Sequence, residues 1–322
     1  MVNVPHTFIS SLIESEMPLD VIWEYLQNKI WEPETDIVSY FNKNEKKASD
    51  FERFIRDVYF EVYDEIVNEA MKGRPKLKEM MEQDAYTLAI CDGMSIREAN
   101  LLVNELENNG FIIDEYTYEI SHLPSETLSF TRDVLGVSAP SALRTSSAWR
   151  DRCIYIEDLT TDYPIPSSDK VLLFSRFPDR EFDNVSSKIG DSLEDIYGKT
   201  SDVLIKYLKL MESEKIIITS DHGYCTKHPN ATWKVPAMEK EIYQEVFSLA
   251  RFKKRSEIFG DMESKVKEVE EKTGRLKTVN EFVLTNGRYI WPVKGDQKKI
   301  YHGGISFMEN FVPLIVASKV DN

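Results

Sequence analysis

The chain has 322 residues, of which 42% are hydrophobic and 30% are charged, a composition typical of a folded protein rather than a disordered one. Its net charge of −15 disfavours broad electrostatic binding to nucleic acid or anionic lipid, because such binding depends on Lys and Arg displacing counterions from phosphate. A small phosphorylated ligand stays compatible with this charge, since a bound cation and a few arginines create a local positive site.

The cysteines and the N-terminal sequence give a prediction of the cellular compartment. Cys91, Cys153 and Cys225 show no paired spacing, and two of them adjoin apolar runs, so we expect reduced and mostly buried thiols. The stretch "MVNVPHTFISSLIESEMPLD" lacks the basic start and long apolar run of a signal peptide, and no segment has the apolar length of a membrane span. The sequence therefore predicts a soluble, cytoplasmic protein without a membrane partner.

Residues 1–80 have a helical pattern with few strand formers. "LDVIWEYLQNKI" repeats its apolar residues at helical spacing, and "SDFERFIRDVYFEVYDEIVNEAM" does the same, with Ser49 or Asp50 as the expected cap. We interpret residues 1–80 as a helical N-terminal module.

Strand-like and helix-like segments alternate after residue 85. A helix is expected from about Ser95 to Asn109, and another in "TSDVLIKYLKLME". Strands separated by helices predict a largely parallel sheet covered on both faces. The expected strands are residues 86–93, 111–120, 153–158, 171–177 and 215–221.

The C-terminal third is less regular. Residues 239–279 are rich in alternating charge, which predicts exposed helices inserted between core strands, as a cap or a solvated arm. "EFVLTNGRYIWPV" is typical of a hairpin with an Asn-Gly turn, and "ENFVPLIVASK" of a final edge strand.

Acidic and histidine side chains follow the predicted strands at the points where these strands end. The carboxyl ends of parallel strands meet at one edge of an α/β sheet, where ligands bind, so we expect these side chains to lie together. They are common metal ligands, although each one alone is equally compatible with a turn or a helix cap. The residues are Asp92, Asp179, Asp183, Asp221, His222 and His302.

A further hydroxyl-bearing stretch is "SHLPSETLSFTRDVLG". Pro124 and Ser125 open an expected helix that runs to Leu135, with Gly136 as its stop. Thr127 then lies in the first turn, where free backbone N–H groups favour an anion. The alternative makes Ser125 a simple N-cap and gives Thr127 no role.

The order of these motifs resembles that of PglZ domains, within the alkaline phosphatase superfamily. The motifs are "DGM", "PSETLSFTR", "DREFD", "TSDHG" and "HGGISFMENFVP", and the resemblance covers roughly residues 86–318. It implies an alkaline phosphatase-like three-layer α/β sandwich over residues 81–322, with residues 239–279 as a charged helical insertion. Residues 1–80 lie outside it.

The resemblance also implies a site with two divalent metal ions that transfers a phosphoryl group. Asp92, Asp221, His222 and the hydroxyl of Thr127 would hold one zinc-like ion, with Thr127 as the nucleophile. A metal-bound hydroxyl is acidic enough to react at neutral pH. Ser95 ranks below Thr127, because a serine at a helix start is often only a cap.

Asp179 and His302 would hold the second ion, together with Asp183, where the family usually has histidine. A carboxylate in place of an imidazole makes the site harder, which favours Mn²⁺ or Mg²⁺ over Zn²⁺, or else weakens the site. Arg132, Arg251 and His228 are the candidates for contacts to the substrate, each with a plain surface or loop role as the alternative.

The function that follows is a metal-dependent phosphodiesterase or phosphatase acting on a phosphate ester such as a nucleotide or oligonucleotide. The alternative is a catalytically weak or inactive PglZ-fold scaffold in a phage-defence or signalling complex with defence-system partners. A sequence-specific nucleic-acid binder is disfavoured by the net charge of −15.

Overall fold

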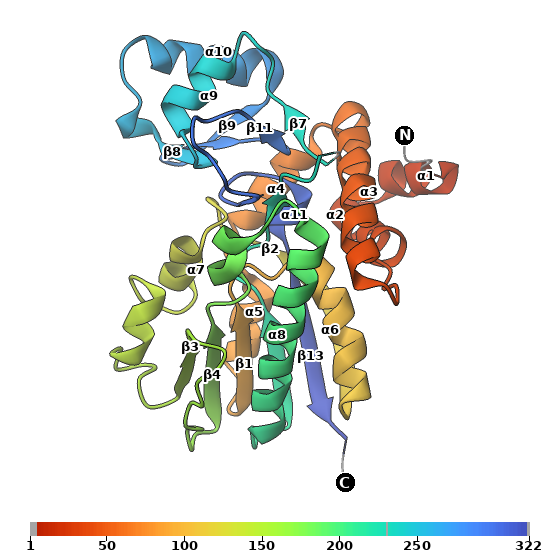
Figure 1. The fold of residues 1–322 in the computed structure, drawn as a ribbon, viewed down its shortest axis with the longest axis vertical. Helices are drawn as coiled ribbons and strands as arrows, with labels where there is room; N and C mark the ends of the chain where they lie inside the picture. The colour runs from red at the N-terminus through yellow and green to blue at the C-terminus, as the bar shows by residue number, and fades with distance from the viewer. Residues whose placement is uncertain (1–4, 230, 321–322) are drawn as a thin grey trace.

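A six-stranded sheet forms the centre of the protein in the computed structural model, which describes residues 5–229 and 231–320 (Figure 1). Strand β1 pairs in parallel with β4 and β5, and β3 pairs in parallel with β4, whereas β13 runs antiparallel to both of its neighbours, β5 and β2. The sheet is therefore largely parallel, as predicted. Its order is β2 (Phe111–Ile120), β13 (Phe311–Lys319), β5 (Lys215–Thr219), β1 (Tyr86–Cys91), β4 (Lys170–Ser175) and β3 (Cys153–Ile156).

Helices cover both faces of this sheet. All six residues of β1 are buried, because alternate side chains enter two separate hydrophobic clusters. One cluster contains Ala89 and Cys91 with residues of α6 (Ile96–Asn108) and α8 (Ile189–Leu210). The other contains Leu88 and Ile90 with residues of α5 (Pro75–Met81), α7 (Thr127–Asp133) and η2 (Pro140–Arg144). These three layers confirm the predicted α/β fold class.

The final strand was expected at an edge of the sheet, and this prediction is wrong. Strand β13 lies between β2 and β5, and Phe311 to Ala317 are all buried. A continuous apolar run is what an interior strand requires, since both of its faces are covered.

The predicted hairpin around the Asn-Gly turn is also wrong. Strand β10 (Phe282–Thr285) pairs with β9 (Leu276–Val279) and β8 (Phe252–Lys254), and β11 (Tyr289–Ile290) pairs instead with β7 (Trp233–Lys234). The tight turn is at Asn280, which has a positive φ of 52°. Asparagine tolerates this conformation because its side chain is short and polar.

A smaller lobe lies at the top of Figure 1. The three-stranded sheet β8-β10-β9 packs there with α9 (Lys240–Phe247) and α10 (Asp261–Thr273), and the lobe has its own hydrophobic cluster. Residues 239–279 thus contain two strands besides the expected helices. Short elements complete the chain: η3 (Asp179–Asn184), β6 (Cys225–Thr226), η4 (Arg255–Glu257), β12 (Ile300–Tyr301) and α11 (Phe307–Asn310).

The N-terminal helices lie beside the sheet layer and share a hydrophobic cluster with α6, α8, β2 and α11 (Figure 1). They are α1 (His6–Glu14), α2 (Pro18–Tyr25), the π-helical η1 (Leu26–Ile30), α3 (Ile37–Val58) and α4 (Val62–Ala70). The side chain of Asp36 caps α3 by accepting from Ser39 N at 3.0 Å. Ser49 and Asp50, the predicted caps, lie inside this helix, because its buried face already begins at Tyr40. In the described residues, no helix combines the length and apolarity needed to cross a membrane.

Candidate metal centre

Three predicted ligands follow neighbouring strands of the sheet. Asp92 comes directly after β1, and Asp221 and His222 come just after β5; all three are buried. Because Ile90 pairs in register with Thr219, the two strand ends lie side by side. Each of the three residues offers one atom that could bind a metal ion, and these three atoms lie within 4.8 Å of one another.

Thr127 is the first residue of α7 and is half-buried beside this group. Its hydroxyl donates to Asp92 Oδ1 at 3.0 Å and lies 3.4 Å from His222 Nε2. The structure thus places the threonine hydroxyl beside the candidate metal ligands Asp92 and His222. Helix α7 has only seven residues, so its dipole is short.

A second group overlaps the first. Asp179, His222 and His302 also offer ligand atoms within 4.8 Å of one another, and His302 Nε2 lies 3.5 Å from Asp179 Oδ1. The rings of His222 and His302 stack, with centroids 4.1 Å apart and 16° between their planes. Because His222 belongs to both groups and presents a single Nε2, the second group has only Asp179 and His302 as ligands of its own.

Backbone carbonyls orient both imidazoles. Nδ1 of His222 lies 2.9 Å from the Gly223 carbonyl, and Nδ1 of His302 lies 3.1 Å from the Ser125 carbonyl. A carbonyl accepts only from an N–H, so each ring carries its proton on Nδ1 and turns a free Nε2 lone pair to the site. Burial and the neighbouring His222 lower the pKa of His302, which keeps this ring neutral.

The carboxylates of the first group are crowded. Burial and the nearby Asp221 and Asp179 raise the pKa of Asp92 well above its ordinary value. Burial alone would raise the pKa of Asp221, but His222 and the N–H of Gly93 lower it overall. Oδ2 of both Asp92 and Asp221 is buried without a hydrogen-bond partner among the described residues. Two unsatisfied carboxylate oxygens beside a free imidazole nitrogen fit a divalent cation, which would replace the proton on Asp92.

Asp183 does not join either group, contrary to the prediction. Its side chain is 74% exposed, and its Oδ1 lies 3.0 Å from Lys298 Nζ. Asp179 and Asp183 lie in the 3₁₀-helix η3. A 3₁₀-helix has three residues per turn, so residues four apart point about 120° away from each other instead of sharing a face.

Residues 179–317 match the family described as the BREX system PglZ alkaline phosphatase-like domain. The PglZ resemblance is shown for this part of the chain. The PglZ match includes Asp179, Asp221, His222 and His302, whereas Asp92 and Thr127 precede it and reach the site through the fold.

Solved structures give distant likenesses. Phosphonoacetate hydrolase from Sinorhizobium meliloti 1021 shares 10% identity with a TM-score of 0.42, over 72% of this chain and 89% of that one. Human ectonucleotide pyrophosphatase/phosphodiesterase 5 shares 10% identity with a TM-score of 0.43, over 73% and 87%. The murine enzyme, as an inactive variant in complex with AMP, shares 12% with a TM-score of 0.41, over 73% and 88%. Likenesses this distant carry no argument about the site. No curated protein matches the chain in sequence.

The "HGG" segment of the PglZ match is held by residues that were predicted for other roles. Arg251 is buried and pairs with Glu309, with its Nε 2.8 Å from Oε1, and it also donates to the carbonyls of Gly287 and Tyr289. Glu309 Oε1 in turn accepts from Gly304 N at 2.9 Å. Arg251 therefore braces the loop that carries His302, with four of its five N–H donors engaged within the protein, and its role as a substrate contact stays a prediction.

The serines near the site act on the backbone. Ser95 accepts from Arg97 N and donates to Glu98, which forms a capping box for α6, so it is a cap as the alternative held. Ser125 accepts from Gly303 N at 2.9 Å and donates to the Gly304 carbonyl at 3.0 Å. It ties α7 to the "HGG" loop, and the residue at the N-cap position of α7 is Glu126.

The other two predicted substrate residues lie outside both ligand groups. Arg132 is exposed in the last turn of α7, and the half-buried His228 follows β6, where its N–H lies 3.4 Å from Thr226 Oγ1. The structure adds a residue that the sequence reasoning missed: Arg176 Nε lies 2.8 Å from Asp92 Oδ2. Its position near the end of the predicted strand 171–177 and three residues before Asp179 was the available signal.

Two contacts from residues 1–80 support the backbone near the site. Arg74 donates to the Ser220 carbonyl at 2.6 Å and to Glu119 Oε2 at 2.9 Å, so it holds the end of β5 just before Asp221. Glu45 of α3 pairs with Arg97, which donates to the carbonyl of Tyr224 at 3.0 Å. The two contacts hold the backbone on either side of Asp221 and His222.

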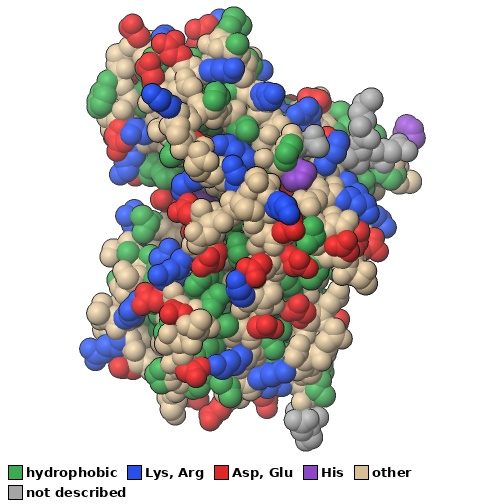
Figure 2. Space-filling view, viewed as in Figure 1, with side chains coloured by type: hydrophobic (Ala, Val, Ile, Leu, Met, Phe, Trp, Pro, Cys, Tyr) green, Lys and Arg blue, Asp and Glu red, His purple; other side chains and the backbone are tan. Residues whose placement is uncertain are grey.

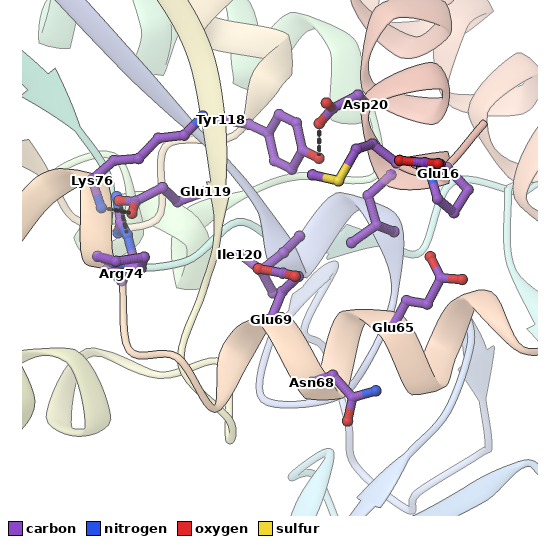
Figure 3. Close-up of a pocket in the computed structure, with 14 residues that line it drawn as sticks. Glu16, Asp20, Glu65, Asn68, Glu69, Arg74, Lys76, Tyr118, Glu119 and Ile120 are labelled. Atoms are coloured by element: carbon purple, nitrogen blue, oxygen red, sulfur yellow. Dashed lines mark hydrogen bonds and ion pairs between the residues drawn. The ribbon is translucent and has the colours of Figure 1, made fainter.

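Arg74 and Glu119 also line a cavity of about 280 Å³ between α2, α4 and β2 (Figure 3). The carboxylates of Glu16, Asp20 and Glu65 face this cavity (Figure 3). None of the candidate metal ligands lines this cavity, and Arg74, which does, donates to the Ser220 carbonyl just before Asp221. The surface hollow between the upper lobe and the lower body, on the left of Figure 2, is bordered by charged side chains of both signs.

Proposed function

We propose that this protein is a divalent-metal-dependent hydrolase of phosphate esters in which Thr127 is the nucleophile. The match to an alkaline phosphatase-like family supports a phosphoester hydrolase in general. The observation that carries the finer proposal is the position of the Thr127 hydroxyl, 3.0 Å from Asp92 Oδ1 and beside His222, among carboxylate oxygens without other partners.

The donor set suits Zn²⁺ or Mn²⁺, because carboxylates are combined with imidazoles. Asp92, Asp221 and His222 would hold one ion, and Asp179 and His302 a second. When bound, such ions would lower the pKa of the Thr127 hydroxyl and neutralise charge that develops on the phosphate.

The residues of the chain account for the bond changes. Thr127 Oγ1 attacks phosphorus as its proton passes to Asp92 Oδ1, the P–O bond to the ester alcohol breaks, and that alcohol leaves with this same proton. Water then attacks the phosphothreonine and releases phosphate and free Thr127. The Gly223 and Ser125 carbonyls orient the two stacked imidazoles, so that each Nε2 is directed to the site.

The substrate class follows from charge. With Asp183 outside the site, three carboxylates remain, so two divalent cations would leave a net positive centre that attracts an anionic phosphate. We propose a small phosphorylated or nucleotide substrate. We further propose that the protein works alongside other proteins of a phage-defence system, a proposal that is motivated by the BREX system named in the family description.

The test is hydrolysis of bis-p-nitrophenyl phosphate and p-nitrophenyl phosphate with added Zn²⁺ or Mn²⁺. We expect Thr127→Ala to lower the rate by at least a thousandfold, because no other hydroxyl occupies its position. Ser129→Ala is the matched control, since Ser129 lies on the same helix and contacts only Glu126, at 3.4 Å, among the described residues. Activity that survives Thr127→Ala would remove Thr127 from this role.

One observation favours a second candidate, a scaffold with little turnover. Without Asp183, the second ligand group has only two side chains of its own, which weakens retention of a second ion. Metal analysis of the purified protein separates the two candidates. Two retained ions favour the hydrolase, and a stable fold that retains none favours the scaffold.

A further inference from the structure

A phosphate ester needs a donor for the phosphoryl oxygens that no cation binds, and neither predicted arginine is placed to supply it. Arg251 has four of its five N–H donors engaged by Glu309 and two carbonyls. Arg132 comes five residues after Thr127 on α7, so it points about 140° around the helix axis from it. The site therefore lacks a substrate cation unless another residue provides one.

Arg176 is the arginine that reaches the site. It directly follows β4, and its Nε lies 2.8 Å from Asp92 Oδ2, while Thr127 holds the other oxygen of the same carboxylate at 3.0 Å. The hydroxyl and the guanidinium are thus neighbours across one carboxylate. The Arg176 side chain is 32% exposed, so it is partly accessible to solvent, whereas Asp92 is fully buried.

The contact between Arg176 and Asp92 is close but not aligned. Arg176 Nε and Asp92 Oδ2 both lack a hydrogen-bond partner among the described residues, despite their separation of 2.8 Å. Two buried polar atoms left in this state carry a free-energy cost that a bound ligand would relieve. A cation would take Asp92 Oδ2, and the guanidinium would then be free to donate to an anion.

We propose that Arg176 binds the nonbridging oxygens of the phosphoryl group that Thr127 attacks, an inference that rests on the proposed function. A guanidinium presents paired N–H donors that match two phosphate oxygens, and its charge persists at every working pH. It also accompanies the oxygens as the phosphorus passes from the ester to Thr127, so it stabilises the charge in both states.

The alternative gives Arg176 a structural role as the counter-ion of Asp92. The two roles differ in what a substitution removes. A counter-ion affects the metal affinity of the centre, whereas a phosphate ligand affects anion binding at constant metal content. A readout for each quantity is therefore required.

The test measures binding of inorganic phosphate and of vanadate to the Mn²⁺-loaded, full-length protein by calorimetry, with metal content determined in parallel. We expect Arg176→Ala to weaken phosphate binding by about tenfold to a hundredfold, in line with loss of charged hydrogen bonds, and to leave metal content unchanged. Arg176→Lys should recover part of the affinity, since it keeps the charge but not the paired donors. Arg180→Ala is the matched control, because Arg180 lies four residues further on, is exposed and donates to the Glu157 carbonyl.

Each other outcome has a defined meaning. Phosphate affinity equal to wild type in Arg176→Ala, with p-nitrophenyl phosphate still hydrolysed by wild type, overturns the assignment of Arg176 alone. Loss of metal together with phosphate in Arg176→Ala overturns it in favour of the counter-ion role. Absence of both hydrolysis and phosphate binding in the metal-loaded wild type overturns the proposed function and this inference with it. Thermal unfolding of each variant verifies that it is folded.

Discussion

Asp179 and Asp183 show how strongly backbone geometry decides the role of a single side chain. Both carboxylates belong to one short motif, yet Asp179 lies with His302 while Asp183 pairs with Lys298 at the surface. The 3₁₀ geometry of η3 separates their directions. A motif match therefore fixes the residue type at a position but not the direction in which that residue points.

This geometry predicts the metal content of two variants. Asp183→Ala should retain the wild-type number of ions, because its carboxylate lies away from the centre, whereas Asp179→Asn should lose at least half of the more weakly held ion. Elemental analysis after dialysis measures both. An ion lost from Asp183→Ala would show that η3 rearranges when metal binds.

The motifs identify some of the site residues from sequence alone, but not the arginine that contacts Asp92. Asp92, Thr127, Asp221 and His222 could be grouped from their motifs, and the structure brings them together. Arg251 and Arg176 could not be told apart, because a buried ion pair with Glu309 and a contact with Asp92 both depend on long-range packing.

Among the elements, the N-terminal helices are the ones whose part in the site was least expected. Residues 1–80 lie outside the PglZ match, yet Arg74 holds the Ser220 carbonyl, and Glu45 acts through Arg97 on Tyr224. The division into a module of residues 1–80 and a domain of residues 81–322 stays a prediction, and these contacts cross it.

Arg74 gives a test of this support. Arg74→Met removes the charged partner of the buried Glu119 carboxylate and leaves it only the backbone N–H groups of Lys76 and Leu77 among the described residues, so we expect a loss of about 3–5 kcal/mol in the free energy of unfolding, together with weaker metal binding. Denaturant unfolding and metal titration measure the two effects.

A surface pair serves as the control for Arg74. Lys78→Ala removes an exposed contact with Asp133 nearby and should cost less than about 1 kcal/mol. Metal affinity unchanged in Arg74→Met would contradict a supporting role for the N-terminal helices.

Sequence periodicity is sufficient to predict some of the helices and strands, but not how all of the strands pair. Alternation of strands and helices predicted the parallel part of the sheet, because local patterns decide it. The interior place of β13 and the pairing of β10 with β9 depend on which distant strand is the partner, and no local pattern contains that information.

At the scale of the whole molecule, buried charge makes stability depend on pH. Glu52 of α3 is fully buried and accepts from Phe307 N at 3.1 Å, five residues beyond His302. Burial, opposed by Arg288, raises the pKa of Glu52 to about 7. The unfolded chain loses this proton near pH 4.5, whereas the folded chain keeps it to about pH 7.

The unfolded state thus binds fewer protons across this interval, so the contribution of Glu52 to stability falls as the pH rises from about 4.5 to about 7. Glu52→Gln removes this dependence. We expect its stability relative to wild type to increase by on the order of 2–3 kcal/mol between pH 4.5 and pH 8. Denaturant unfolding at both pH values measures it.

Glu61→Gln, at an exposed position, is the control and should follow wild type at both pH values. A constant difference between Glu52→Gln and wild type would mean that Glu52 is ionised in the folded protein throughout the interval.

Gly223, which follows His222, lies against α11, the short helix that begins five residues after His302. A Cβ atom at this position would come within 2.2 Å of the Met308 carbonyl oxygen, closer than any packed structure allows. Even alanine there would force α11 or the segment of Asp221 and His222 to move. A single codon change at 223 would therefore disturb the segment that carries two of the candidate metal ligands, and with it the hydrolase activity proposed for this protein.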